Sequence, residues 1–187
     1  WDHQIRTEPA LQMAMDRKFK QHRSLAVITP GLTADAIRSF GLRVGNIETS
    51  AALSVEGRVG WNIPNDFGTY PIRPGAENRP PSSSAPTARP ADAGPPDRGL
   101  KAGIHLFSTL EVKAVAHDFS LDGNLLRSSH RVSRRPWVAQ ASLGLSTQLP
   151  IAGRGVKLAW MRVWRTREFE QQTSRHSYGS VAASIEF

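Results

Sequence analysis

Residues 137–149 read WVAQASLGLSTQL, and this stretch decides the fold. Apolar or small side chains occupy its odd-numbered positions, from Trp137 through Leu143 and Leu145 to Leu149. Polar or small side chains, such as Gln140, occupy the even-numbered positions. A period of two places one set on each face of a β-strand. The stretch therefore predicts a strand with one apolar face and one polar face.

Two further stretches repeat this alternation over about a dozen residues each, namely Thr49–Trp61 and Ile104–Ala116. Strands of soluble proteins usually have ~5–6 residues, whereas a tilted membrane-spanning strand needs ~9–11. The polar faces carry small residues together with Gln, Glu and Arg, which suit the wet interior of a barrel. Length and chemistry together favour strands that cross a membrane.

Four less regular strands are predicted at Ala10–Phe19, Leu25–Thr33, Val156–Phe169 and Tyr178–Phe187. In the third, Arg162 interrupts an apolar face, so either the strand bulges there or Arg162 reaches lipid headgroups. About seven strands result, whereas a bacterial single-chain barrel needs an even number and at least about eight. We therefore predict an all-β fold, an antiparallel transmembrane β-barrel that is incomplete here, with N-terminal strands missing. Residues 1–187 would form the C-terminal part of one barrel domain.

The last residues carry the sharpest local signal. Val181, Ala183, Ile185 and Phe187 alternate with smaller or polar residues, and the chain stops on Phe. This ending resembles the C-terminal signature of bacterial outer-membrane barrels, which the barrel-assembly machinery reads. It predicts a location in the bacterial outer membrane and that machinery as a partner through Phe187. The alternative is an edge strand that happens to end in Phe.

Residues 71–101 break the strand pattern. They contain eight prolines and a run of three serines, Ser82–Ser84. Such a segment cannot form a sheet ladder and has too few apolar residues to pack. It is predicted to be a long, mobile loop within the barrel domain. Binding through a proline motif is the alternative.

Composition excludes several classes of site. The absence of Cys excludes disulfides, thiolate metal sites and a Cys nucleophile, and no Gly-x-Ser-x-Gly segment supports an α/β-hydrolase esterase. The formal net charge of +8 suggests a polyanionic partner, which could be nucleic acid, anionic lipid or lipopolysaccharide phosphate. Because the basic residues are scattered among amphipathic strands without an aromatic RNA-binding motif, we expect no nucleic-acid partner.

Neither a membrane-spanning helix nor a signal peptide is expected. No apolar run reaches the ~18 residues that such a helix needs. The chain opens Trp1-Asp2-His3-Gln4, without a basic segment followed by an apolar one. Because this opening enters the middle of a motif, we expect a fragment rather than a processed mature protein.

Five segments carry a resemblance to a known family. They are Trp1–Pro9, Gly45–Thr49, Ile63–Gly68, Phe119–Asn124 and Arg165–Phe169. In this order, they resemble segments of the lipid A 3′-O-deacylase family (LpxR-type outer-membrane enzymes) across nearly the whole chain. The Pro-rich insert departs from the family pattern.

The resemblance implies a hydrolase that removes the 3′-linked acyloxyacyl chain from lipid A of lipopolysaccharide, with Ca²⁺ as its usual cofactor. In such chemistry a His activates water, and a hard cation held by oxygen ligands stabilises the oxyanion. The resemblance makes His3 the catalytic base candidate and Glu8 a metal ligand or an orienting group. Alternatively, His3 is an exposed terminal residue and Glu8 a structural charge facing the lumen. The family's early Asn-Asp motif precedes residue 1, so this chain alone is expected to be inactive.

A basic loop follows the segment Asp122-Gly123-Asn124. Counted back from a periplasmic C-terminus, this loop lies on the extracellular side, where arginine forks suit the phosphates of lipid A. Its arginines could instead contact lipopolysaccharide non-specifically. The predicted substrate-binding residues are Arg127, Arg131, Arg134 and Arg135. Asp122-Gly123-Asn124 itself predicts a turn rather than a cation site.

The remaining expectations concern the barrel wall and its assembly. Arg165 and Glu168 are predicted to make lumen or rim contacts rather than to form a catalytic pair. Trp61, Trp137, Trp160 and Trp164 are expected to anchor the barrel at the membrane interfaces. We expect a monomer surrounded by outer-membrane lipids. A non-catalytic barrel, either a channel or a structural protein, is the alternative function.

Overall fold

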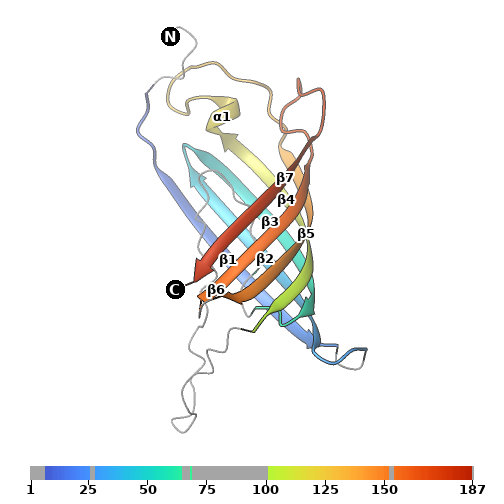
Figure 1. Cartoon of the computed structure of the whole chain (residues 1–187). Helices are drawn as coiled ribbons and strands as arrows, with labels where there is room; N and C mark the ends of the chain where they lie inside the picture. The colour runs from blue at the N-terminus through green and yellow to red at the C-terminus, as the bar shows by residue number, and fades with distance from the viewer. Residues whose placement is uncertain (1–6, 26–27, 65–67, 69–100, 152–153, 187) are drawn as a thin grey trace.

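A computed structural model describes residues 7–25, 28–64, 68, 101–151 and 154–186. These residues form one antiparallel sheet whose seven strands lie in sequence order, and Figure 1 shows the strands tilted and the sheet curled into a wall. The strands are β1 Gln12–Ser24, β2 Leu32–Gly45, β3 Glu48–Trp61, β4 Gly103–Asp118, β5 Trp137–Ile151, β6 Arg154–Arg165 and β7 His176–Glu186. The predicted all-β, antiparallel architecture is confirmed, and within the described residues β1 and β7 are the unjoined edges of the sheet.

Most exposed apolar side chains of the sheet lie on its outer face, whereas the inner face is largely polar apart from a buried cluster of Phe107, Met161 and Val163. On the concave inner face, Arg58, His105 and Ser146 are at most 3% exposed. On the convex outer face, Leu53 and Leu145 are 64% and 44% exposed. A soluble sheet buries its apolar face, whereas a membrane barrel turns that face to lipid and keeps polar residues inside. The strands therefore have the faces of an outer-membrane barrel wall.

One predicted strand was wrong. Among the described residues of 25–33, Leu25 and residues 28–31 lie outside any strand and only Leu32 and Thr33 belong to one, because the chain turns between β1 and β2. The Leu25 N–H donates to the Leu32 carbonyl at 2.9 Å, and Gly31 adopts a φ of 77°. The Pro30-Gly31 pair favours this turn, since glycine takes a positive φ without strain. The second strand instead begins at Leu32 and ends at Gly45.

Alternation in β2 is obscured by charges on both faces. Arg38 lies outward among apolar residues, and Asp35 lies inward. The inward carboxylate of Asp35 is 1% exposed and accepts a hydrogen bond from the Arg58 guanidinium at 2.6 Å. Because Arg58 is also buried, the two side chains share an ion pair inside the sheet's concavity, joined by Lys20 at 3.1 Å. Sequence periodicity alone does not reveal such a pair.

The other strands follow the predicted faces, and the ambiguity at Arg162 is resolved. The pairing of β6 with β5 and β7 continues through Arg162 without a shift, so no bulge is present there. Arg162 instead projects outward and donates to the Ser177 hydroxyl at 3.0 Å. The four tryptophans are also outward and exposed, although their anchoring role stays a prediction.

The strand connections lie at two rims. The rim that carries the short helix α1 (Phe119–Asp122) is the α1 rim, and it also holds the start of β1 and the β2–β3 connection (Figure 1). The carboxyl end of β7 lies at the opposite rim, as do the end of β3 and the start of β4. Apart from Lys101 at its end, the predicted loop 71–101 falls outside the described residues. No helix in the described part of the chain is long and apolar enough to span a membrane.

Candidate functional site at the α1 rim

The α1 rim brings together three segments that are distant in sequence. They are the segment before β1, the β2–β3 connection at Asn46 and Ile47, and the β4–β5 connection, which begins with α1. In an antiparallel meander, alternate connections lie at the same end of the sheet. The polar side chains of these segments therefore meet above the ends of the strands.

Glu8 joins all three segments. Its Oε1 accepts a hydrogen bond from Asn46 Nδ2 at 3.0 Å, and its Oε2 accepts one from Asn124 Nδ2 at 2.9 Å. The backbone N–H of Leu126 also donates to Oε2, at 3.4 Å. The bonds from Asn46 and Asn124, the former having the larger effect, hold the pKa of Glu8 below its ordinary value of 4.5. Glu8 is therefore ionised at neutral pH.

Asn46 has an amide orientation fixed by its neighbours. Its Oδ1 accepts a hydrogen bond from the backbone N–H of Leu11 at 2.8 Å, while Nδ2 also donates to the Pro9 carbonyl at 2.6 Å. Exchanging the oxygen and nitrogen of this amide would place like groups against each other. The nitrogen therefore points at Glu8, and the carboxylate sits against a donor.

Arg134 fastens the β4–β5 connection to the end of β4. Its Nε donates to Asp122 Oδ2 at 2.7 Å, and one Nη donates to the Val115 carbonyl at 2.6 Å. The other Nη donates to the Ala116 carbonyl. His117, which is buried beside them, has its Nε2 3.1 Å from the Asn46 carbonyl. The guanidinium of Arg134 is thus held by protein groups at all three nitrogens.

The four arginines predicted to bind substrate do not converge on one point. Arg127 is exposed, and its charge adds a smaller lowering of the pKa of Glu8 to that of the hydrogen bonds from Asn46 and Asn124. Arg131 is also exposed. Arg135 is partly buried, and its backbone N–H donates to the Glu168 carbonyl in the β6–β7 connection at 2.7 Å. Of the four arginines, Arg127 and Arg131 are therefore exposed on the β4–β5 connection, whereas Arg134 makes contacts within the protein.

The described residues do not fit a calcium centre. Both oxygens of Glu8 accept hydrogen bonds from N–H donors, and an oxygen-coordinated cation needs several carboxylate or carbonyl oxygens. Within the described ranges, no group of three or more His, Cys, Asp or Glu residues is placed to hold a metal ion. Of the two roles predicted for Glu8, this geometry suits the orienting one. His3, the predicted base, lies outside the described residues.

Asp122-Gly123-Asn124 ends α1 as a turn, as predicted. Gly123 has a φ of 75°, and its N–H donates to the Phe119 carbonyl at 3.1 Å. The side chains on both sides of the glycine contact protein groups, since Asp122 binds Arg134 and Asn124 binds Glu8. The turn thus places the Asp122 carboxylate against Arg134 and the Asn124 amide against Glu8.

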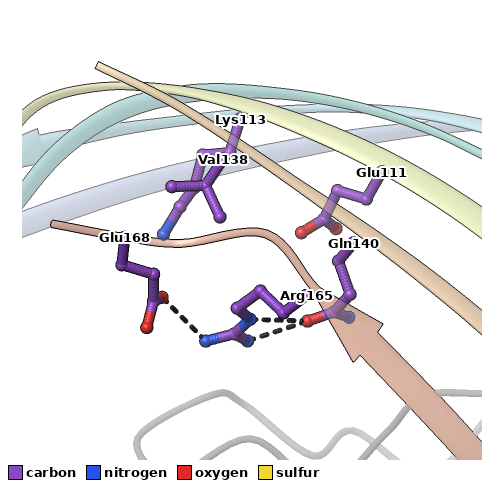
Figure 2. A pocket seen from close by; sticks show the side chains of 6 residues that line it. All are labelled: Glu111, Lys113, Val138, Gln140, Arg165 and Glu168. Carbon is purple, nitrogen blue, oxygen red and sulfur yellow. Dashed lines mark hydrogen bonds and ion pairs between the residues drawn. The ribbon is translucent and has the colours of Figure 1, made fainter. Parts of the chain in front are cut away.

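A small polar hollow, open to solvent, lies on the inner face below the rim. Figure 2 shows the Arg165 guanidinium there between Gln140 and Glu168. It donates to Gln140 Oε1 at 2.8 and 3.0 Å and to Glu168 Oε1 at 2.9 Å. The prediction that Arg165 and Glu168 make lumen or rim contacts is confirmed. Lys113, across the hollow, is paired with Glu48 at 2.9 Å.

Sequence reasoning gave no role to Asn46 or His117. Asn46 stands in the Gly45–Thr49 segment and His117 near the end of β4, where an Asn suggests a turn and a His a polar strand residue. Their meeting with Glu8 and α1 depends on strand pairing between residues more than thirty positions apart. The feature of the sequence that pointed to this region was the ordered resemblance of its segments to one family.

Comparisons with known proteins agree with this architecture. LpxR from Salmonella typhimurium is a similar solved structure: the match covers 99% of this chain with a TM-score of 0.64, at 13% sequence identity. At that identity, the likeness shows the fold alone. The chain spans 54% of the length of the Salmonella protein. No curated protein matches the chain in sequence.

The family itself is shown by a match over the full sequence. The model of the family described as "Outer membrane protein LpxR" matches residues 1–187. This agrees with the exposed apolar face of the sheet, and together they confirm the predicted outer-membrane location. The chain therefore belongs to the LpxR family of outer membrane proteins.

Proposed function

We propose that this chain is part of an outer-membrane ester hydrolase that removes the 3′-linked acyloxyacyl chain from lipid A. The family match over residues 1–187 is the observation that carries the proposal. Water adds to the ester carbonyl, the bond to the sugar oxygen breaks, and a carboxylic acid and a sugar hydroxyl result. Because the chain spans about half of the Salmonella protein, the activity is proposed for the whole protein.

The α1 rim supplies an ordered edge at which such a substrate could be held. Glu8, Asn46 and Asn124 fix the segment before β1 against two connections. His3 precedes this anchored segment in sequence and is the proposed base that takes a proton from water. Glu8 is the proposed positioning residue, since its hydrogen bonds to Asn46 and Asn124 hold the segment in place.

The exposed arginines give the rim its proposed affinity for lipid A phosphates. Arg127 and Arg131 are exposed on the β4–β5 connection, and guanidinium groups bind phosphate oxygens in pairs. Arg134 and Arg135 would act by shaping this connection rather than by touching the substrate. Calcium remains a proposal from the family resemblance, and no step here depends on it.

Fatty-acid release from lipid A by outer membranes that contain the full-length protein tests this function. We expect release of the acyloxyacyl acid, loss of release in His3→Ala, and a fall of at least tenfold in kcat/KM in Glu8→Gln. Glu168→Gln is the matched control, because Glu168 lies on the same rim but contacts Arg165 instead. Addition of a chelator to the wild-type protein tests the need for calcium separately.

Two outcomes would contradict parts of this proposal. Undiminished release in His3→Ala would remove His3 as the base while leaving the hydrolase in place. The absence of ester cleavage by the wild-type protein, in membranes where it migrates as a folded barrel, would favour the non-catalytic barrel. Replacing Arg127 and Arg131 together by Gln should raise KM on phosphorylated lipid A, and an equal effect on dephosphorylated lipid A would remove the phosphate contact.

A further inference from the structure

The outer face of the sheet is not uniform. Over β3, β4 and β5 the exposed outward side chains carry no charge and, Ser108 apart, are aliphatic or aromatic, as Leu53, Leu110 and Leu143 illustrate. Over β1 and β2 the same face carries two arginines near the middle of the strands. Arg17 lies opposite Phe40, and Arg38 lies opposite Phe19. We call these four residues, Arg17, Phe19, Arg38 and Phe40, the arginine patch.

The arginines of the patch are exposed and point away from the lumen. The guanidinium of Arg17 stacks over the Phe19 ring, with 5.0 Å between its central carbon and the ring centroid. Lys20 and Asp35, the charged pair of these two strands, project to the other face. In the described part of the chain, no ion pair joins Arg17 or Arg38 to a carboxylate.

Lipid hydrocarbon is an unfavourable environment for the charges of this patch. Arg17 is the sixth of the 13 residues of β1 and Arg38 the seventh of the 14 residues of β2, and near the middle of a membrane-spanning strand a charged side chain on the lipid face is destabilising. Arg162, by contrast, lies near the α1-rim end of β6, from which a guanidinium can reach headgroups. Two adjacent guanidiniums in the middle of neighbouring strands cannot both be relieved in that way.

The composition of the patch is that of a protein interface. Arginine, methionine and aromatic residues are enriched where proteins meet, and Met13 and Met15 continue the patch along β1. A second copy related by a two-fold axis would bring the same surface to itself, and thus arginine against arginine. The favoured occupant therefore carries the opposite charge.

We propose that the arginine patch is covered by a second membrane protein, different from this chain, whose wall presents carboxylates to Arg17 and Arg38. Guanidinium–carboxylate pairs formed away from water would satisfy both charges in the bilayer. The proposal concerns the outer face of β1 and β2 and is independent of the proposed hydrolase activity at the α1 rim. It adds a heterologous partner and keeps the chain itself in single copy.

Accessibility to membrane-dissolved oxygen tests whether protein or lipid covers the patch. The chain has no Cys, so Met15→Cys on β1 and Leu145→Cys on β5 each accept one nitroxide label. In native outer membranes we expect the label at position 15 to show at least threefold fewer oxygen collisions than the label at 145. Adding Arg17→Glu and Arg38→Glu should remove this difference, while heat-modifiable migration confirms that the barrel is folded.

Reconstitution of the labelled protein in vesicles distinguishes which kind of molecule covers the arginine patch. In vesicles of zwitterionic phospholipid without other proteins, both labels should be equally accessible. Protection of position 15 in these vesicles would indicate a second copy, and protection only after lipopolysaccharide is added would indicate an anionic lipid. Equal accessibility already present in native membranes would show that lipid covers the patch. Any of these three results would overturn the proposal.

Carbodiimide coupling tests for the carboxylates directly. In a variant with Arg17→Lys and Arg38→Lys, a membrane-soluble carbodiimide should condense a lysine amine with a partner carboxylate, forming an amide while the carbodiimide becomes a urea. The expected product is a discrete adduct with a different protein. It should be absent from the wild type, in which Lys18 and Lys20 serve as the control for coupling through other lysines of β1. Failure of this variant to form an adduct in membranes where position 15 is protected would exclude carboxylates as the partner groups.

Discussion

The two faces of this sheet require opposite surroundings for the side chains of the same strands. The inner face buries charged and polar side chains, such as Arg58 and Asp35, which must find partners within the protein. The outer face exposes residues such as Leu53 and Leu145, which need no partner but require an apolar solvent. A substitution should therefore be judged by the face on which it lies rather than by its exposure. Inside, lost partners and lost space should be costly, whereas outside, added charge should be costly.

The largest difference between the faces is expected at their arginines. Arg58→Ala removes the closest cationic partner of the buried Asp35 carboxylate and leaves it with Lys20 and His22, and breaking a buried pair costs about 3–5 kcal/mol. Arg162→Ala on the outer face removes only a bond to Ser177 and should change stability by less than about 1 kcal/mol. Urea unfolding in phospholipid vesicles, followed by Trp fluorescence, measures both free energies. Equal effects would mean that the inner ion pair does not support the fold.

The reverse comparison places a new charge on each face of β5. Leu145→Arg puts a guanidinium on the lipid face near the middle of the strand, which should destabilise the protein by about 2–4 kcal/mol. Gln148→Arg places the same group on the inner face near the strand end, where water and polar groups are available. We expect a much smaller change there in the same unfolding measurement. A similar loss in both variants would contradict the assignment of the two faces.

Two glycines extend the comparison to packing. A Cβ at inward Gly144 would lie 2.4 Å from the Trp160 carbonyl oxygen and 2.5 Å from Phe107, so Gly144→Ala should cost about 1–3 kcal/mol. No atom lies within 4 Å of the corresponding position at outward Gly57, and there Ala should stabilise the strand by about 0.5–1 kcal/mol. Opposite signs are expected in thermal unfolding of the two variants. Destabilisation of equal size would show that both glycines are needed for their backbone conformation.

The faces were predictable from sequence because side-chain alternation depends only on strand geometry. Strands such as β5, in which polarity alternates along nearly the whole length, were placed almost to the residue. The second strand was misplaced because Arg38 interrupts its apolar outer face and Ile37 its polar inner face. Charges placed by tertiary pairing, or by a partner, remove the periodic signal on which the prediction depends.

The candidate site was predictable only in part, for a different physical reason. The resemblance pointed to Glu8 and to the arginines of the β4–β5 connection, but not to their partners. Asn46 and Asn124 reach Glu8 from 38 and 116 positions away, through the register of four strands. Local patterns carry no information on such distances. They could not show, therefore, that Arg134 would bind α1 while Arg127 remains near Glu8.

The smallest expected effect lies at the rim, where neither face is involved, and it appears as a dependence on pH. Hydrogen bonds from Asn46 and Asn124 depress the pKa of Glu8 in the folded protein below the ordinary 4.5. Its contribution to stability is thus present above pH 4.5 and is lost as the pH falls through the lower, folded-state pKa. Hydrogen exchange of the Leu126 amide should therefore accelerate as the pH falls below 4.5, relative to amides of β5, after correction for intrinsic rates. Glu8→Gln should abolish that pH dependence and show fast exchange throughout. A protection of Leu126 that is unchanged between pH 6 and pH 3 would mean that Glu8 does not hold the connection.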